Sequence, residues 1–330
     1  MKRISYIFLV MAVLTGAACT EIDPGSDRPD TRFPYIFFDA EVISSTRANL
    51  VEETSLPSDE GTSFGVFGYR NVPSENEGDD PVKDPVFEGV EEMFRPSDDG
   101  AFIYRNLTTW TEDQHDFYAY YPYDDNDSFV IAFGLNTESG DPYIHYLQPD
   151  SRDAMVDLMT AKAEKQTSNS APVALQFQHR LFALDFELVD ATTSDTPLEV
   201  NSVSVMISGI IEKADLLYDG SIIYTDRTLI IEEDLYNATD PVPFTDKRYN
   251  LNDGFSYLFL PCDDLSVYFE LSGSDEWGSY NQITGSGKIK PVGGFKPGKK
   301  YTVTITKTDA DGFVTSLSGW EGEEITHTFN

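Results

Sequence analysis

Cysteine and histidine are scarce in this sequence, which holds two cysteines and four histidines among 330 residues. Two cysteines cannot build a disulfide scaffold, and four histidines leave little material for a metal centre. Positive charge is scarce as well, because 23 Lys and Arg oppose 57 Asp and Glu and give a net charge of −34. A surface of that sign repels nucleic acid and anionic lipid headgroups. These shortages exclude disulfide-rich scaffolds and proteins that bind polyanions through a basic field.

Catalytic motifs are also missing. The sequence has no Gly-x-Ser-x-Gly elbow, no His-Glu-x-x-His, no Walker loop and no dinucleotide-binding glycine pattern. Its 57 carboxylates form too many possible pairs for one glycosidase-like pair to stand out. Residues 124–128 could hold calcium or form a solvated turn, but Leu135 stands where an EF-hand needs its closing Glu. We therefore expect a protein that is not an enzyme and that uses no cofactor and no metal.

A long apolar run occurs only near the N-terminus. Lys2 and Arg3 precede the segment from Ile4 to Leu14, and small residues follow up to Ala18. This order of basic, apolar and small residues is typical of a secretory signal, and the run is too short to span a bilayer. We expect residues 1–18 to be a signal peptide.

Cys19 follows the small residues directly and allows two interpretations. It resembles the acylated cysteine of a bacterial lipobox, or it lies just after an ordinary cleavage site formed by Gly16 and Ala18. Several acyl chains on one cysteine would hold the chain on a membrane. Residues 19–32 are polar and contain two prolines and a glycine, so we expect a lipid-anchored tether there. Cys262 then lacks a disulfide partner and is expected to be a small, partly buried residue.

From residue 33 onward the dominant pattern is an alternation of apolar and polar residues. Residues 265–271 and 301–306 alternate in this way, and Gly, Pro, Asp and Asn separate the short runs. The pattern is typical of half-buried strands in sandwiches or barrels, so we expect an all-β fold. Residues 151–165 could form a helix or a short strand plus a turn. A break in the alternation at 190–198 indicates a domain boundary.

Aromatic and histidine side chains offer further candidate sites. Trp110 and Trp277 could stack on sugar rings if they are exposed, or they could belong to the core. His179 alternates with Phe177 and Leu175, so we expect a hydrogen-bonded core histidine rather than a ligand.

One segment reverses the acidic character of the chain. Residues 288–307 contain no acid and six lysines, which are Lys288, Lys290, Lys296, Lys299, Lys300 and Lys307. These lysines could protect an edge hairpin against unwanted strand pairing, or they could dock an acidic neighbour.

Several short motifs follow one another in order along residues 33–330. They are Phe37-Phe38-Asp39-Ala40, Thr46-Arg47-Ala48, Phe64–Gly68, Asp116–Tyr123, Leu175–His179 followed by Phe182–Phe186, Leu258–Pro261, Pro297–Tyr301 and Trp320. Together they resemble the fimbrillin-like (Mfa-like) family of the Bacteroidetes, whose members are type V pilus subunits and lipoproteins. The pair at 175–179 and 182–186 matches the central hairpin of that family.

The resemblance implies a fold and a function. It implies two tandem transthyretin-like Greek-key β-sandwich domains, at residues 33–190 and 195–330. It also implies a non-enzymatic structural subunit (shaft, tip or anchor) of an adhesive surface pilus. Such a subunit has other pilin subunits as partners and reaches the outer membrane through the lipid on Cys19.

Assembly in this family proceeds by strand exchange in those members that polymerise. An Arg-specific protease removes the leading strand, and the exposed groove then accepts a strand from the next subunit. Arg47 matches the cleaved position, and residues 33–43 upstream are apolar enough to be that strand. Alternatively, Arg47 is an exposed loop residue and the strand stays in place. Only ten residues follow Trp320, so 323–330 could be the last native strand or a short donor.

A different function also fits the export signal, the acidity and the aromatic content. The chain could be a surface glycan-binding lipoprotein that accompanies a polysaccharide importer, with Trp110 and Trp277 as the stacking residues.

Overall fold

The computed structural model describes residues 35–42, 56, 62–75, 78, 80–87, 91–94, 102–125, 127–168, 171–196, 198–226, 229–243, 247–252, 254–275, 278–309, 312–319 and 324–328. Over these residues the chain is all-β, with four sheets, one short 3₁₀ turn, η1 (Arg152–Ala154), and no α-helix. The expectation of an all-β chain is confirmed. None of the described segments is a helix of the length and apolar character that crossing a membrane requires.

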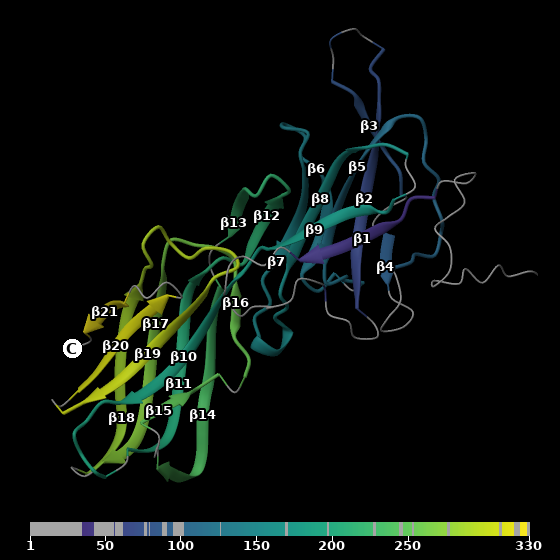
Figure 1. Ribbon diagram of the computed structural model, residues 1–330. Helices are drawn as coiled ribbons and strands as arrows, with labels where there is room; N and C mark the ends of the chain where they lie inside the picture. The colour runs from purple at the N-terminus through teal and green to yellow at the C-terminus, as the bar shows by residue number, and fades with distance from the viewer. Residues whose placement is uncertain are drawn as a thin grey trace, which may run out of the picture.

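The first half of the chain forms a seven-stranded sheet and contributes to a four-stranded bridging sheet (Figure 1). The seven-stranded sheet has the order β1 (Phe38–Val42), β9 (Val173–His179), β8 (Met159–Gln166), β5 (Gln114–Tyr121), β2 (Ser63–Val72) and β3 (Val82–Pro85), with β4 (Glu91–Phe94) also on β2. The bridging sheet has the order β13 (Ile222–Asp226), β12 (Lys213–Leu217), β7 (Pro142–Leu147) and β6 (Val130–Leu135).

The second half forms a six-stranded sheet and a further four-stranded sheet. The six-stranded sheet has the order β15 (Arg248–Asn250), β10 (Phe182–Asp190), β19 (Lys300–Thr308), β20 (Gly312–Gly319) and β21 (Glu324–Thr328), with β16 (Tyr257–Phe259) also on β10. The other sheet has the order β14 (Leu229–Pro243), β11 (Glu199–Ile210), β17 (Leu265–Asp275) and β18 (Gly278–Ile289). These two sheets lie at one end of an elongated molecule, and the seven-stranded sheet lies at the other (Figure 1).

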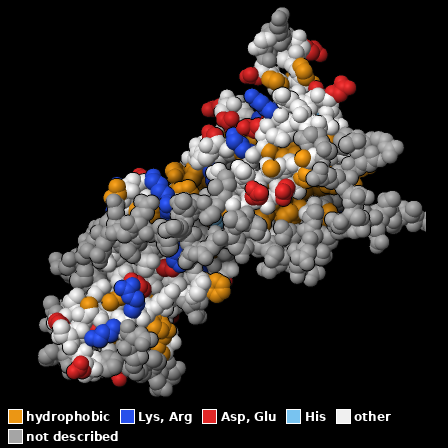
Figure 2. Space-filling model, viewed as in Figure 1, with side chains coloured by type: hydrophobic (Ala, Val, Ile, Leu, Met, Phe, Trp, Pro, Cys, Tyr) orange, Lys and Arg blue, Asp and Glu red, His pale blue; other side chains and the backbone are white. Residues whose placement is uncertain are grey.

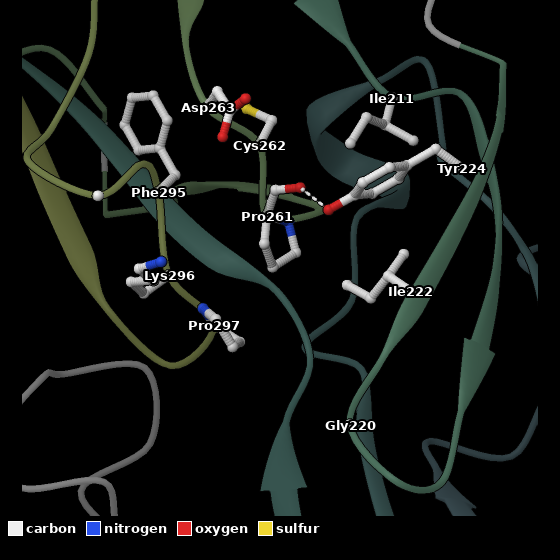
Figure 3. A pocket seen from close by; sticks show the side chains of 11 residues that line it. Ile211, Gly220, Ile222, Tyr224, Pro261, Cys262, Asp263, Phe295, Lys296 and Pro297 are labelled. Carbon is white, nitrogen blue, oxygen red and sulfur yellow. Dashed lines mark hydrogen bonds between the residues drawn. The ribbon is translucent and has the colours of Figure 1, made fainter.

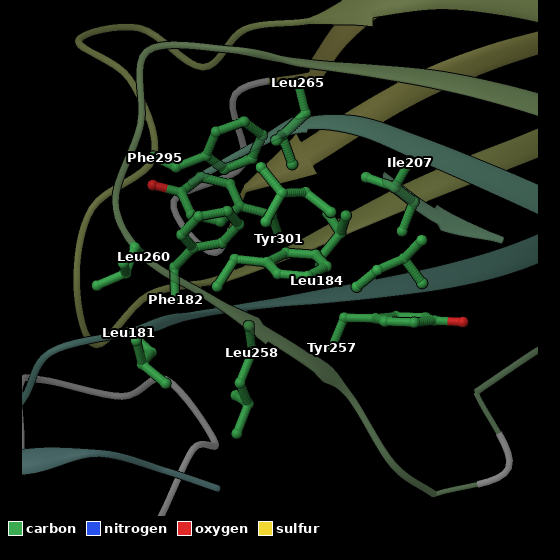
Figure 4. Close-up of a cluster of buried hydrophobic side chains, with 14 of the residues drawn as sticks. Leu181, Phe182, Leu184, Ile207, Tyr257, Leu258, Leu260, Leu265, Phe295 and Tyr301 are labelled. Carbon is green, nitrogen blue, oxygen red and sulfur yellow. The ribbon is translucent and has the colours of Figure 1, made fainter. Parts of the chain in front are cut away.

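Two clusters of buried side chains form the core. The smaller one lies on the seven-stranded sheet and joins residues from Ile36 to Phe177. The larger one runs from Phe67 to Ile305 and contains residues of both halves. Around Phe182 it is densely aromatic, because the ring of Phe295 stacks on that of Phe182 at 4.4 Å (Figure 4). Burial of alternate side chains along each strand accounts for the period-two pattern of the sequence.

Residues 151–165 form no α-helix. They contain η1 and the start of β8, which matches the alternative of a strand plus a turn. Along β8 the buried Ala161 and Ala163 alternate with the exposed Lys162 and Glu164, so the segment has the period of a strand.

Strand pairing divides the chain differently from the expected boundary at 190–195. β9 and β10 do not pair as a hairpin, because β9 lies in the seven-stranded sheet and β10 lies in the six-stranded sheet. β10 pairs with β19 in parallel from Ala183 to Asp190, so this strand belongs with the C-terminal half. Conversely, β12 pairs with β7 and returns to the first half. The apolar alternation of β10 gives no information on its partner, because it assigns a face to each residue but no neighbouring strand.

Candidate functional site at the leading strand

The most distinctive site is the groove beside β9 that holds the leading strand, β1, the first of the described strands. β1 lies at the edge of the seven-stranded sheet and pairs in parallel with β9, from Phe38 opposite Val173 to Val42 opposite Phe177. Among the described strands, β9 is its only neighbour. The strand is therefore held from one side by a single ladder of main-chain hydrogen bonds.

Side chains of this segment fill apolar space in the smaller core. Phe38, Ala40 and Val42 are buried while Asp39 and Glu41 are exposed, and Ile36 just before the strand is fully buried. The ring of Phe38 meets that of Phe117 edge to face at 5.1 Å. Burial of each large apolar side chain contributes about 1.5–3 kcal/mol. Loss of the strand would therefore expose a deep apolar groove as well as one edge of β9.

Polar contacts fix the start of the segment from the other side. The Tyr104 hydroxyl donates a hydrogen bond to the Ile36 carbonyl at 2.6 Å, and the Ile36 amide donates to the Thr108 carbonyl at 2.9 Å. Tyr35 forms an antiparallel bridge with Thr109. Burial raises the pKa of Tyr104 to about 12, so its hydroxyl stays protonated and able to donate well into the alkaline range. Sequence reasoning missed Tyr104, because the chain offers no local signal for a contact across 68 residues.

Several residues selected from the sequence lie outside the described part of the chain. These include Cys19 with the expected signal peptide and tether, Arg47, Trp277 and Trp320. β1 ends at Val42, on the N-terminal side of Arg47. Lipidation and cleavage therefore stay predictions.

Trp110 lies in the core rather than on the surface. Its side chain is 7% exposed, and its ring contacts those of His115 at 5.1 Å and Phe117 at 5.8 Å. This placement favours the packing interpretation of Trp110 over stacking on a sugar. Burial lowers the pKa of His115, so this imidazole resists protonation beside the indole.

The other sequence candidates have structural partners. A carboxylate oxygen of Asp124 accepts hydrogen bonds from the amides of Phe129 and Val130 at 2.7 and 2.9 Å, which closes a turn. Within the described ranges, no group of three His, Cys, Asp or Glu residues is placed to hold a metal ion. His179 is buried and its Nδ1 lies 2.9 Å from a carboxylate oxygen of Asp157, as expected for a hydrogen-bonded core histidine.

The C-terminal segment pairs with its own sheet. β21 lies antiparallel to β20, with Thr328 opposite Val314 and Glu324 opposite Ser318. Within the described strands it is the edge of the six-stranded sheet, so in this chain it has the place of a last native strand.

The chain was compared with models of protein families and with curated proteins. A family model described as fimbrillin-like matches residues 46–320. A search of curated proteins found no match.

Solved structures of similar proteins cover nearly the whole chain at low identity. A putative cell adhesion protein from Bacteroides uniformis is 19% identical, covering 86% of this chain and 96% of that one with a TM-score of 0.48. One from Bacteroides ovatus is 13% identical, covering 89% and 98% with a TM-score of 0.49. The fimbrial anchor protein Mfa2 from Porphyromonas gingivalis is 11% identical, covering 88% and 98% with a TM-score of 0.43.

Proposed function

The chain belongs to the fimbrillin-like family, a structural family without enzymatic activity, and from this premise we propose that it is a subunit of an adhesive surface pilus. In this proposal the chain is exported as a lipoprotein, anchored through Cys19 to the outer membrane and built from two transthyretin-like sandwiches. Its partners are other pilin subunits. The subunit serves as shaft, tip or anchor.

The placement of β1 is the observation that supports this function best. The strand is an edge strand, it carries alternate buried side chains, and it precedes Arg47 in the chain. In the proposed assembly, cleavage at Arg47 frees the strand and a strand of the next subunit takes its place. The driving force is the burial of apolar side chains in the vacated groove and the main-chain hydrogen bonding of the new strand to the open edge of β9.

The test is limited digestion of the purified precursor with a protease specific for arginine. We expect cleavage after Arg47, followed by oligomers that survive size-exclusion chromatography. The matched control is Arg47→Gln, which should stay monomeric under the same digestion.

A synthetic peptide of residues 33–43 tests the groove directly. After the cleaved strand is removed, the peptide should raise the melting temperature, because it refills the apolar positions and the ladder on β9. A peptide carrying Phe38→Ser should raise the melting temperature much less. If cleavage at Arg47 produces neither oligomers nor peptide binding, the strand-exchange proposal is wrong, although membership of the family stands.

A further inference from the structure

A small pocket lies where the β12–β13 hairpin faces two loops of the C-terminal half. Its volume is about 290 Å³ (Figure 3). Ile222 and Tyr224 come from β13, Pro261 follows β16, and Lys296 and Pro297 come from the loop before β19. The pocket is far in sequence from β1 and takes no part in the proposed strand exchange.

The walls of the pocket combine apolar and polar groups, and hydrogen bonds hold them in place. The Tyr224 hydroxyl donates a hydrogen bond to the Pro261 carbonyl at 3.0 Å, which orients the ring along the pocket while 47% of the residue stays exposed (Figure 3). On the opposite side, the Phe295 amide donates to the Cys262 carbonyl at 2.8 Å. A Cβ on Gly294 would come within 2.9 Å of the same carbonyl, so the two loops are in close contact. The pocket is therefore preformed.

The lysine cluster at 288–307 is not one continuous basic strip. Lys288 pairs with Asp264 at 3.1 Å, and Lys300 pairs with Asp185 at 2.5 Å. Lys307 is buried within β19. Only part of the cluster is therefore available to a partner.

Lys296 supplies the positive charge of the pocket. Its side chain is exposed, it forms no ion pair with any described residue, and its Nζ would lie 3.8 Å from a Cβ on Gly293. Asp263, also in the lining, provides a carboxylate that can accept hydrogen bonds. Lys and Arg side chains lie beside hydrophobic ones on the face shown in Figure 2.

We propose that this pocket binds one pyranose ring that carries a carboxylate, as in a uronic or sialic acid. Its volume lies at the lower limit for ligand sites, which suits a single ring. The C–H face of a sugar would pack on Tyr224 and the prolines, and the carboxylate would pair with Lys296. Asp263 would accept hydrogen bonds from hydroxyl groups. A pilus subunit with this site would recognise acidic glycans independently of strand exchange.

Titration of the mature full-length chain by calorimetry or ligand-observed NMR tests the proposal. The probes are glucuronate, galacturonate and N-acetylneuraminate, with glucose and galactose as neutral rings and propionate as a carboxylate without a ring. We expect at least one acidic sugar to bind with a Kd of about 1 mM, because a ligand of this size makes few contacts. Neutral sugars and propionate should bind about tenfold more weakly or not at all.

Single-residue variants test whether the acidic sugar binds in this pocket or elsewhere on the surface. Lys296→Gln should weaken acidic-sugar binding about tenfold, since a charge-assisted hydrogen bond is lost from an exposed residue that folding does not need. Tyr224→Ala should also weaken acidic-sugar binding, because it removes the aromatic face on which the sugar ring packs. The matched control is Lys288→Gln, which removes a cation of the same segment outside the pocket and should leave the affinity unchanged.

Three results would overturn the proposal. One is the absence of acidic-sugar binding to the folded protein at millimolar concentration. Another is an affinity that Lys296→Gln leaves unchanged. The last is propionate that binds as tightly as the sugars, because the ring would then contribute nothing.

Discussion

At the residue scale, Tyr104 links the leading strand to the rest of the molecule. Its hydroxyl donates to the carbonyl of Ile36, and its ring meets that of Phe87 edge to face at 5.9 Å. Burial disfavours the phenolate, which is why the pKa rises from 10.0 to about 12. A single proton therefore stabilises the contact between this residue and the strand.

The raised pKa predicts an alkaline loss of stability. Unfolded Tyr104 ionises near pH 10, whereas the folded form keeps its proton up to about pH 12. The stabilising contribution is therefore complete below pH 10 and is lost as the pH rises through 12. Urea unfolding at a series of pH values should show a smaller alkaline decline in the free energy of unfolding for Tyr104→Phe than for the wild type. Other buried tyrosines titrate equally in both proteins, so equal declines would contradict this role.

At the element scale, each half pairs a glycine with a phenylalanine on the neighbouring strand. Gly68 on β2 lies opposite Phe117 on β5, and Gly285 on β18 lies opposite Phe269 on β17. The aromatic ring covers the glycine in both pairs. A Cβ on Gly68 would lie 2.7 Å from Phe117 Cδ1, and one on Gly285 would lie 2.6 Å from Phe269 Cζ. These glycines give the rings room to lie flat on the sheet.

Gly285→Ala should therefore destabilise the C-terminal half. The added methyl group must displace the buried ring of Phe269, which costs about 1–3 kcal/mol in the free energy of unfolding. Chemical denaturation measures the loss. Ser286→Ala changes an exposed neighbour on the same strand and should stay within about 0.5 kcal/mol of wild type. Equal stability of the two variants would show that the ring moves without cost.

At the scale of the whole molecule, the two halves are joined by the bridging sheet. β12 continues that sheet from β7, and His145 pairs with Asp215 across the two strands at 2.5 Å. Tyr218, just after β12, donates its hydroxyl to the Ala119 carbonyl at 3.1 Å, and its ring contacts that of Tyr118 at 5.1 Å. One side chain from the C-terminal half is thus buried against β5 of the first half, within the larger core cluster.

Tyr218→Ala should uncouple the halves. Removal of a buried aromatic ring costs about 3–5 kcal/mol, and here the loss falls on the contacts between the halves. Scanning calorimetry should show two separated transitions in the variant where the wild type shows one. Tyr218→Phe keeps the ring and should retain a single transition. One transition at a lower temperature in Tyr218→Ala would mean that the β7–β12 ladder alone couples the halves.

The sequence by itself determined the strands and the class of the protein. Alternation along residues 265–271 and 301–306 specified which side chains are buried, because successive residues of a strand point to opposite faces. The few histidines and cysteines argued against a metal centre, and the ordered motifs indicated the family. The leading strand was also predicted, since residues 33–43 are apolar and precede Arg47.

Only the tertiary structure decided which strands are neighbours. Period-two alternation assigns a face to each residue but gives no information on pairing, which depends on contacts between distant segments. For this reason β9 and β10 belong to different sheets, β12 returns to β7, and Trp110 is buried beside Phe117. The pocket beside Tyr224 arises in the same way, because a hairpin and two loops from separate parts of the chain meet there.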